Sequence, residues 1–171
     1  MSSNERQGRL RTPPHDLEAE KALLGALILK PDTMHDVSTF VRPESFYAEK
    51  HGEIYRAIYD IFVHSDPIDL LTVTNGLKQK KQLERIGGAS YLAEIIETVP
   101  AAGNAVYYGQ LVNAKSLLRG LIHAADEIAE LGYSDPNEVD VVLDQAEKKV
   151  YDVTNATTSQ KFKTISSSLA E

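Results

Sequence analysis

The sequence contains no cysteine, which excludes disulfide frameworks, thiolate catalysis and cysteine-ligated zinc, and which fits a reducing cytoplasm. It has no run of about 18 apolar residues, so no segment is predicted to span a membrane. Basic residues are the minority, since 18 Lys and Arg face 25 Asp and Glu and give a formal charge of −7. Nucleic-acid-binding domains usually carry a basic surface. Direct DNA binding is therefore disfavoured as the main task of this chain.

Sequence signatures of catalysis are also missing. There is no G-x-x-x-x-G-K-[ST] phosphate loop and no dinucleotide fingerprint, and no serine lies in a nucleophile elbow. No two histidines have H-x-x-x-H spacing, and zinc usually needs several converging ligands. We interpret His51, two residues before Glu53, as part of a solvated helix start rather than an acid/base pair. These observations predict no catalytic, cofactor or metal site. The histidines are His15, His35, His51, His64 and His123.

Helix start and stop signals organise the first half of the chain. We interpret residues 1–14 as a mobile arm. Asp16 is predicted to cap a first helix that Pro31 stops, and Glu18 and Glu20 fall in its first turn, where carboxylates favour the helix dipole. Later helices are predicted over 32–40, around Ile54 and Ile58, after Asp69, and between the Gly87-Gly88 turn and Pro100.

The second half is punctuated less often. Residues 104–131 are predicted to form one helix of about 27 residues, roughly 40 Å long at 1.5 Å per residue. Gly132 is expected to end this helix in the left-handed conformation, and Asp135-Pro136 is expected to begin the next one. That helix covers residues 139–153, where apolar side chains alternate near four and three, as in a coiled-coil seam.

With 171 residues, 42% of them hydrophobic, the chain is long enough for one compact domain and an extension. No strand is predicted, so the fold class is all-α. We expect a helical globule over residues 15–102, followed by a long antiparallel helical hairpin over 103–153 that turns at 132–134. The Ser/Thr-rich residues 154–171 are interpreted as a linker, and their end, 164–171, is expected to form a short helix when docked.

Apolar residues fall on two rows of the long predicted helix. The row of Leu111, Leu118, Ile122, Ala125 and Ala129 is expected to face the last helix. A second row lies roughly 100° around the helix, and one antiparallel partner covers only a narrow seam. The second row needs another surface, either the helices of the first half or another subunit or protein. Its members are Val106, Leu117, Leu121 and Ile128.

The only basic cluster comprises Lys78, Lys80, Lys81 and Arg85. It is either a solvated loop, which the acidic composition favours, or a contact to phosphate groups. Two functions other than protein binding stay open on these grounds. The first alternative is a stand-alone helical nucleic-acid-binding module, which the charge of the chain disfavours. The second is a small α-helical enzyme, which the missing motifs disfavour.

Three stretches in order resemble the N-terminal domain of bacterial replicative DNA helicases of the DnaB family. The first is P-P-H-D-L-E-A-E over residues 13–20, leading into L-L-G-A-L-I. The second runs from Phe46-Tyr47 and His51 through I-Y-R-A-I to P-I-D-L-L-T-V at residues 67–73. The third comprises G-G-A-S-Y-L at 87–92 and P-A-A-G-N-A-V-Y-Y at 100–108. In the third, Ala101 replaces the usual Ser or Thr, and Gly103 replaces the usual Ala.

This resemblance implies a scaffold domain without an activity of its own. Family members use the globule and hairpin to pair, to form a hexameric collar and to bind the helicase-binding domain of primase, and they meet loader proteins. A RecA-like ATPase domain is expected beyond residue 171, so ATP and Mg²⁺ are expected there and not in this chain. We expect an isolated domain or a truncated relative that acts in the bacterial cytoplasm and contacts DNA only indirectly.

The resemblance also implies interface residues. The primase-contacting positions of the family fall on Glu18, Tyr91, Ile122 and Ile128, and Leu117 and Leu121 join the predicted partner or subunit interface from the second row. Other roles stay open for three of them. Tyr91 shares its helix with core residues, Glu18 lies where a carboxylate favours the helix dipole, and Ile122 belongs to the row expected to face the last helix.

Overall fold

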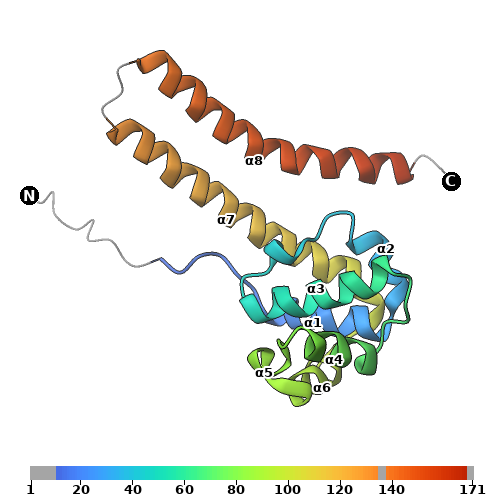
Figure 1. Cartoon of the computed structure of the whole chain (residues 1–171). Coiled ribbons are helices and arrows are strands. Elements are labelled where there is room, and N and C mark those ends of the chain that lie inside the picture. The colour runs from blue at the N-terminus through green and yellow to red at the C-terminus, as the bar shows by residue number, and fades with distance from the viewer. Residues whose placement is uncertain (1–10, 135–137, 169–171) are drawn as a thin grey trace, which may run out of the picture.

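The computed structural model describes residues 11–134 and 138–168, with side chains described as far as residue 155. Within those ranges every regular element is a helix and there is no strand, which confirms the all-α prediction. Figure 1 shows a globule of mostly short helices from which two long helices project, α7 (Ala105–Tyr133) and α8 (Val139–Ser168).

Helix α1 (Leu17–Leu29) forms the centre of the globule. Asp16 begins it as predicted, because its carboxylate accepts the Ala19 N–H at 2.9 Å. The helix is buried on nearly all sides, and α3, α6 and α7 pack against it. A Cβ atom at Gly25 would lie 2.2 Å from Cγ2 of Val99, so glycine lets the segment after α6 approach α1 closely.

The predicted helix over residues 32–40 is wrong in extent. It is divided into the 3₁₀ turn η1 (Pro31–Thr33) and the short helix α2 (Met34–Val37). The Thr39 hydroxyl donates to the Asp36 carbonyl at 2.7 Å, and such side-chain bonds compete with helix continuation. A second 3₁₀ turn, η2 (Pro43–Ser45), leads into the predicted helix α3 (Glu49–Val63), whose buried residues belong to the same core as α1.

Helix α4 (Leu70–Gln79) begins at Asp69, whose carboxylate accepts the Thr72 N–H at 2.8 Å. The following stretch was expected to be a loop but contains α5 (Leu83–Ile86), because Ile86 is buried and draws the segment onto the core. Gly87 and Gly88 have φ of 109° and 76°, the conformations that glycine adopts readily at a turn. Helix α6 (Gly88–Glu97) and the turn η3 (Ala102–Asn104) then lead to α7.

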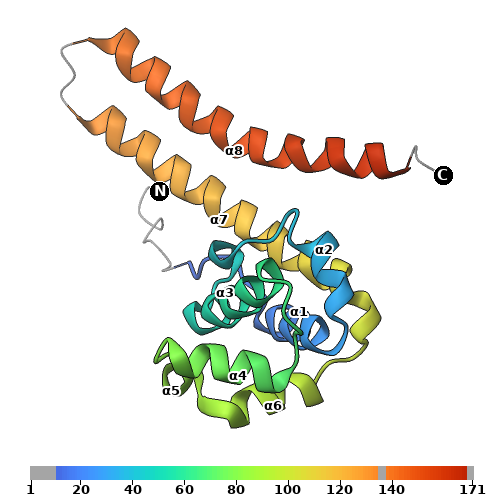
Figure 2. The same ribbon diagram turned by 45° about the vertical axis from the view of Figure 1, so that its right-hand side comes forward.

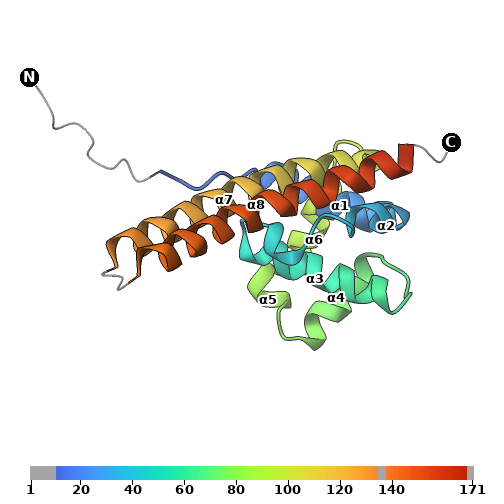
Figure 3. The same cartoon turned by 90° about the horizontal axis from the view of Figure 1, so that it is seen from above.

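Helix α7 has 29 residues, about 43 Å at 1.5 Å per residue. Its first turns are buried in the globule, and the rest packs along α8 (Figures 2 and 3). The expected left-handed Gly132 is wrong, because this residue is helical and the helix ends at Ser134 in an extended conformation. The Ser134 hydroxyl donates to the Leu131 carbonyl at 2.6 Å and satisfies the helix end without a glycine. The predicted cap at Asp135-Pro136 lies outside the described residues.

Helix α8 continues through Ser168, whereas the sequence was expected to leave the helix after Val153. No proline or glycine follows Pro136 in the sequence, so no residue with a strong helix-breaking preference stops it. The Thr154 hydroxyl lies 3.2 Å from the Val150 carbonyl and is satisfied within the helix. Among the described helices, none is long and apolar enough to cross a membrane.

Candidate functional site

A chain of polar side chains crosses the globule from α1 through α3 to α6. The Glu20 carboxylate lies 2.5 Å from Nδ1 of His51, and Nε2 of His51 lies 2.7 Å from the Tyr91 hydroxyl. Glu20 and His51 are only 2% and 1% exposed, and Tyr91 is half-buried. Buried polar groups need partners of this kind, because an unsatisfied one costs about 1–3 kcal/mol.

Glu20 also completes the start of α3. The N-cap residue Ala48 has no side-chain oxygen with which to cap the helix. The Glu20 carboxylate accepts the N–H groups of Tyr47 at 2.5 Å and of Ala48 at 3.4 Å. A carboxylate at a helix N-terminus is favoured by the free N–H groups and by the helix dipole. Glu20, in the first turn of α1, therefore also caps the start of α3, and the expected solvated role of His51 is wrong.

We name the surface around the exposed edge of this chain the Tyr91 surface, which comprises Glu18, Lys21, Lys50, Tyr91 and Glu94. The Lys50 ammonium lies 3.8 Å from the centre of the Tyr91 ring, a cation–π contact. A hydrogen bond from Lys21 to Glu18, at 3.0 Å, raises the pKa of Lys21, and Tyr91 and Glu94 add weaker attractions. Glu18 and Tyr91 are thus brought to one surface, and Glu18 is exposed.

Arg119 joins the long helix α7 to the globule. Its guanidinium donates to the carbonyls of Pro14 at 2.8 Å and Ser45 at 2.7 Å. Burial lowers the pKa of Arg119, while Glu20 and the Tyr47 ring act in the opposite direction. The ring of Tyr47 stacks on His15 with 4.2 Å between centroids. The described end of the N-terminal arm, residues 11–16, is therefore held against the point where α7 leaves the globule.

The seam between α7 and α8 combines small, charged and partly buried apolar side chains. Ala124 is buried, and Glu127 of α7 pairs with Lys149 of α8 at 3.2 Å. A small residue such as Ala124 allows two helices to approach closely. The partly buried residues of α8 follow a spacing of four, three and four, which is typical of a coiled-coil seam; they are Val142, Ala146, Lys149 and Val153.

Beside this seam lies an exposed apolar surface, which we name the hairpin face. At 100° per residue, the exposed apolar residues of α7 lie about 120° around the helix axis from its seam residues. Those of α8 lie about 80° around their own axis from its seam residues. In both helices the rotation from the seam follows the direction of increasing residue number. Because the two helices are antiparallel, the same rotation turns both sets toward one side of the hairpin. Leu118, Leu121 and Ile122 are 46%, 51% and 47% exposed. The hairpin face comprises Leu118, Leu121 and Ile122 of α7 with Val139, Leu143 and Val150 of α8.

The predicted assignment of the two rows on α7 is wrong. Leu118 and Ile122, expected to face α8, are exposed, whereas Leu111 of the same row packs on the globule core. In the second row Val106 also packs on that core, Leu121 is exposed, and Leu117 and Ile128 are partly buried. Ala124, which is buried in this part of α7, belongs to neither of the two predicted rows.

The basic cluster is partly neutralised by local ion pairs. Lys80 pairs with Asp60, and Arg85 lies 3.3 Å from Glu49. No group of three or more His, Asp or Glu side chains suited to a metal ion occurs in the described part of the chain.

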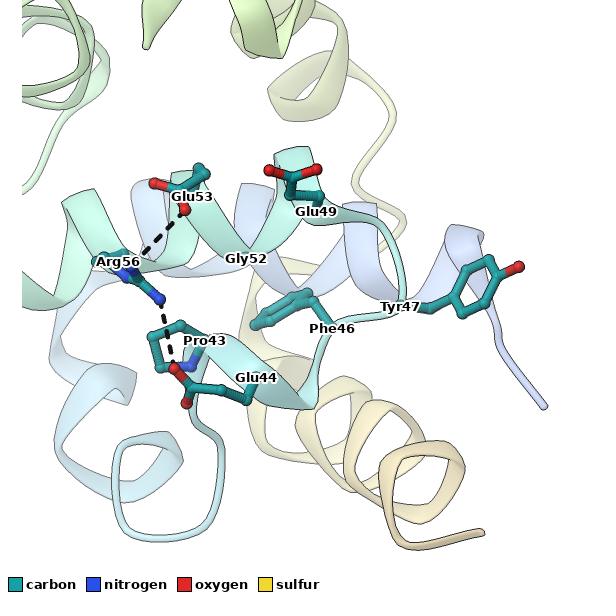
Figure 4. Close-up of a pocket in the computed structure, with 8 residues that line it drawn as sticks. All are labelled: Pro43, Glu44, Phe46, Tyr47, Glu49, Gly52, Glu53 and Arg56. Carbon is teal, nitrogen blue, oxygen red and sulfur yellow. Dashed lines mark hydrogen bonds and ion pairs between the residues drawn. The ribbon is translucent and has the colours of Figure 1, made fainter. Parts of the chain in front are cut away.

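A hollow of about 280 Å³ lies between η2 and the start of α3 (Figure 4). Arg56 pairs across it with Glu44 at 3.3 Å and along α3 with Glu53 at 3.7 Å, and Glu49 is the partner of Arg85. Each carboxylate of the hollow already has a cationic partner, so the hollow is a weaker candidate than the two surfaces above.

Sequence reasoning missed Glu20, His51 and Arg119, which organise the globule. Glu20 carried a signal, because it is an acidic residue in a helix that is otherwise apolar on most sides. Nothing local indicates that Arg119 would reach Pro14 and Ser45, which are 105 and 74 residues away in the sequence.

Comparison with known proteins supports these features. A family model described as the DnaB-like helicase N-terminal domain matches residues 12–114. The replicative DNA helicase DnaB of Geobacillus stearothermophilus is 42% identical over 161 residues, which are 94% of this chain and 36% of that protein. The replicative DNA helicase DnaC of Bacillus subtilis is 39% identical with the same coverage. The chain thus spans about a third of the length of these relatives.

Solved structures agree. The N-terminal domain of DnaB helicase from Mycobacterium tuberculosis matches with a TM-score of 0.77 and 40% identity, over 82% of this chain and 99% of that one. A DnaB-like replicative helicase, solved in a study that also covered its interactions with primase, matches with a TM-score of 0.67 over 81% of this chain and 31% of that one. At 23% identity the second match shows the fold alone.

The family model matches more than half of the chain. The chain belongs to the family of DnaB-like helicase N-terminal domains, as its sequence motifs had indicated.

Proposed function

We propose that this chain holds the subunits of a replicative DNA helicase together and binds primase. The hairpin face is the observation that carries the proposal. Monomeric proteins rarely expose large contiguous apolar patches, and such patches mark interaction sites. Six large apolar side chains lie on this one face of the hairpin. Because the chain belongs to the helicase family, we assign the face to contacts between helicase subunits.

A second copy of the chain is the partner proposed for the hairpin face. In a two-fold symmetric dimer the same patch is used by both copies, so it must be complementary to itself. The hairpin face meets this requirement, because apolar residues dominate it and no charge of its own has to be matched. Leu121 and Ile122 are assigned to subunit pairing, and Leu117 and Ile128 to packing within the hairpin.

Primase is the partner proposed for the Tyr91 surface. Glu18 and Tyr91, which the resemblance indicated as primase contacts, belong to α1 and α6, two helices that pack against each other. Two solved relatives, a DnaB-like replicative helicase and the N-terminal domain of DnaB from Helicobacter pylori, are described with their interactions with primase. Aromatic residues with a polar rim are typical anchors of such interfaces.

The remaining functions belong to the whole helicase. ATP and Mg²⁺ bind in a RecA-like ATPase domain outside this chain, six copies form a collar, and DNA is contacted only indirectly. A helicase loader is a further partner. The helicases that match the chain from Geobacillus stearothermophilus and Bacillus subtilis are bacterial proteins, which supports a function in the bacterial cytoplasm.

Sedimentation velocity tests the pairing. The wild-type chain is expected to self-associate, and Leu121→Asp is expected to weaken the association at least about ten-fold, or 1.4 kcal/mol. Gln145→Asp is the matched control, because it adds the same charge at an exposed position of α8 outside the hairpin face. A wild-type chain that remains monomeric at high concentration, or equal effects of the two variants, would contradict the proposal.

Calorimetry with the helicase-binding domain of a bacterial primase tests the second surface. Tyr91→Ala is expected to weaken binding strongly, whereas Leu121→Asp is expected to change the intrinsic affinity little. Circular dichroism must show unchanged helicity in each variant. If Leu121→Asp removed primase binding and Tyr91→Ala did not, primase would belong on the hairpin face instead.

A further inference from the structure

The chain from Glu20 through His51 to Tyr91 determines which way the Tyr91 hydroxyl points its proton. We propose that Glu20 and His51 are positioning residues that present the Tyr91 oxygen to the binding partner as a hydrogen-bond acceptor. This inference rests on the proposed role of the Tyr91 surface in primase binding. It adds two buried residues that touch no partner and states which kind of partner group meets Tyr91.

The first step is the proton on His51. Glu20 accepts N–H groups with both oxygens, from Tyr47 at 2.5 Å and from Ala48 at 3.4 Å. A carboxylate offers only acceptors. Nδ1 of His51, 2.5 Å from Glu20, therefore carries a proton and donates it. In the neutral ring the other nitrogen is then an acceptor.

The second step is the proton on Tyr91. Its hydroxyl oxygen lies 2.7 Å from Nε2 of His51, and the planes of the two rings are parallel to within 2°. Because Nε2 is the acceptor of the neutral ring, the hydroxyl is the only donor between these two atoms and donates its proton inward to His51. The oxygen keeps its lone pairs for a group outside the chain.

The third step is the consequence for recognition. If the hydroxyl turned to donate outward, Nε2 of His51 would lose its partner at a site that is 1% exposed. An acceptor left unsatisfied in such a place is costly. The partner group that meets the Tyr91 oxygen is therefore a donor, a peptide N–H or a cationic side chain, and an acceptor at this position is disfavoured. Glu18 and Glu94, on the same surface, also favour donors.

Glu20→Gln reverses the order of the hydrogen bonds with little change of shape. Its amide oxygen can still accept the Tyr47 N–H, but its NH₂ group donates to Nδ1 of His51. The proton on His51 then moves to Nε2, which donates to Tyr91, and the hydroxyl has to donate outward. Nitrogen-15 NMR of the full chain is expected to show the Nδ1–H form in the wild type and the Nε2–H form in Glu20→Gln.

Binding is measured by calorimetry against the helicase-binding domain of primase. Tyr91→Phe and Glu20→Gln are each expected to weaken binding about ten-fold, because one hydrogen bond is lost or opposed. The double variant is expected to bind no more weakly than Tyr91→Phe alone, since Glu20 acts through the hydroxyl. Tyr107→Phe, at an exposed tyrosine of α7, is the matched control and is expected to have no effect.

Several outcomes would overturn the inference: an Nε2–H or doubly protonated His51 in the wild type, or additive effects of the two substitutions. If Glu20→Gln did not fold, Tyr91→Phe would still test the direction of the hydrogen bonds. It should change the nitrogen-15 chemical shift of Nε2 of His51 and leave the proton on Nδ1. Wild-type chain that does not bind primase would overturn the proposed function and the acceptor role with it. The NMR result would then decide the hydrogen-bond order alone.

Discussion

The globule buries most of its large apolar side chains, whereas the hairpin leaves most of its own exposed to solvent. In the globule, Leu24, Ile58 and Leu92 are inaccessible to solvent, as are most of the large apolar residues around them. In the described hairpin, from residue 117 onward, Ala124 is the only buried apolar residue. The globule thus obtains its stability from its own core, whereas the hairpin keeps much of its apolar area for another molecule. The same chain contains one part that is complete alone and one that a partner completes.

Polar groups follow the same division. The globule contains the buried chain from Glu20 to Tyr91, and in the described part of the molecule no buried side-chain nitrogen or oxygen lacks a hydrogen-bond partner. The hairpin is joined instead by an ion pair, Glu127 with Lys149, whose side chains remain partly exposed. Substitutions should therefore affect folding in the globule and assembly in the hairpin.

The largest contrast is expected between two leucines. Leu24→Ala creates a cavity in the centre of α1 and is expected to lower the free energy of unfolding by about 2–5 kcal/mol. Leu121→Ala removes a half-exposed side chain of the hairpin face and is expected to change it by no more than about 0.5 kcal/mol at low protein concentration. Urea denaturation of both variants measures the difference. Similar losses would show that the hairpin face is part of the folding core.

The junction between the two regions is tested by Arg119. Arg119→Met removes the bonds to Pro14 and Ser45 and is expected to cost about 1.5–3 kcal/mol, the range for hydrogen bonds to a charged group. Trypsin should also cleave the arm after Arg11 faster. Arg119→Lys is the matched control and should recover only part of the loss, because lysine lacks the planar fork of donors. Full recovery by lysine would mean that charge alone holds the junction.

Tyr55 gives the globule a signature at high pH. Burial raises the pKa of Tyr55, and its hydroxyl donates to the Val41 carbonyl at 3.0 Å. In the unfolded chain the hydroxyl ionises near its ordinary value, about pH 10, so above that pH the unfolded state binds fewer protons. Stability is expected to fall there by up to about 1.4 kcal/mol per pH unit from this group.

Tyr55→Phe separates this contribution from others. It is expected to cost about 0.5–1.5 kcal/mol at neutral pH through the lost hydrogen bond and to make the decline above pH 10 less steep. Denaturation between pH 8 and pH 11 measures both effects, with Tyr107→Phe as the exposed control. An unchanged slope would show that Tyr55 ionises as easily in the folded state as in the unfolded one.

The smallest effect is expected at the hairpin ion pair. Lys149→Ala should lower the free energy of unfolding by no more than about 1 kcal/mol, because partly exposed ion pairs contribute little. The effect should shrink as salt is added. A double-mutant cycle with Glu127→Ala isolates the pair. A coupling well above this range would mean that the seam depends on charge more than on the close approach at Ala124.

Local signals predicted much of the fold. Asp16 and Asp69 cap helices through their own side chains, and Gly87 with Gly88 forms a turn, since each acts within a few residues. The two long helices followed from their apolar periodicity and from the absence of proline within them. The end of α8 was missed because a Ser/Thr-rich composition was taken as a linker signal, although those residues stay helical in the absence of proline and glycine.

The surfaces depended on information that no local pattern contains. The position of Glu20 at the start of α3 and the reach of Arg119 to the arm result from tertiary packing. The helical wheel located two apolar rows on α7 but turned the wrong one toward α8, since neither row contains the buried Ala124. The interface roles of Glu18, Tyr91, Leu121 and Ile122 stay predictions, and the experiments above test them.

Helix α7 is unbroken from the globule core to the tip of the hairpin. Each residue inserted between Val112 and Leu118 would turn everything beyond it by about 100° around the helix axis. One extra residue would therefore aim the hairpin face in a different direction while leaving every side chain in it unchanged. Seven extra residues would bring it back to within about 20° of its original aim but about 10 Å further from the globule. Substitutions can change the residues of this face one at a time, whereas a one-residue insertion or deletion in the helix beneath it would turn the whole face at once.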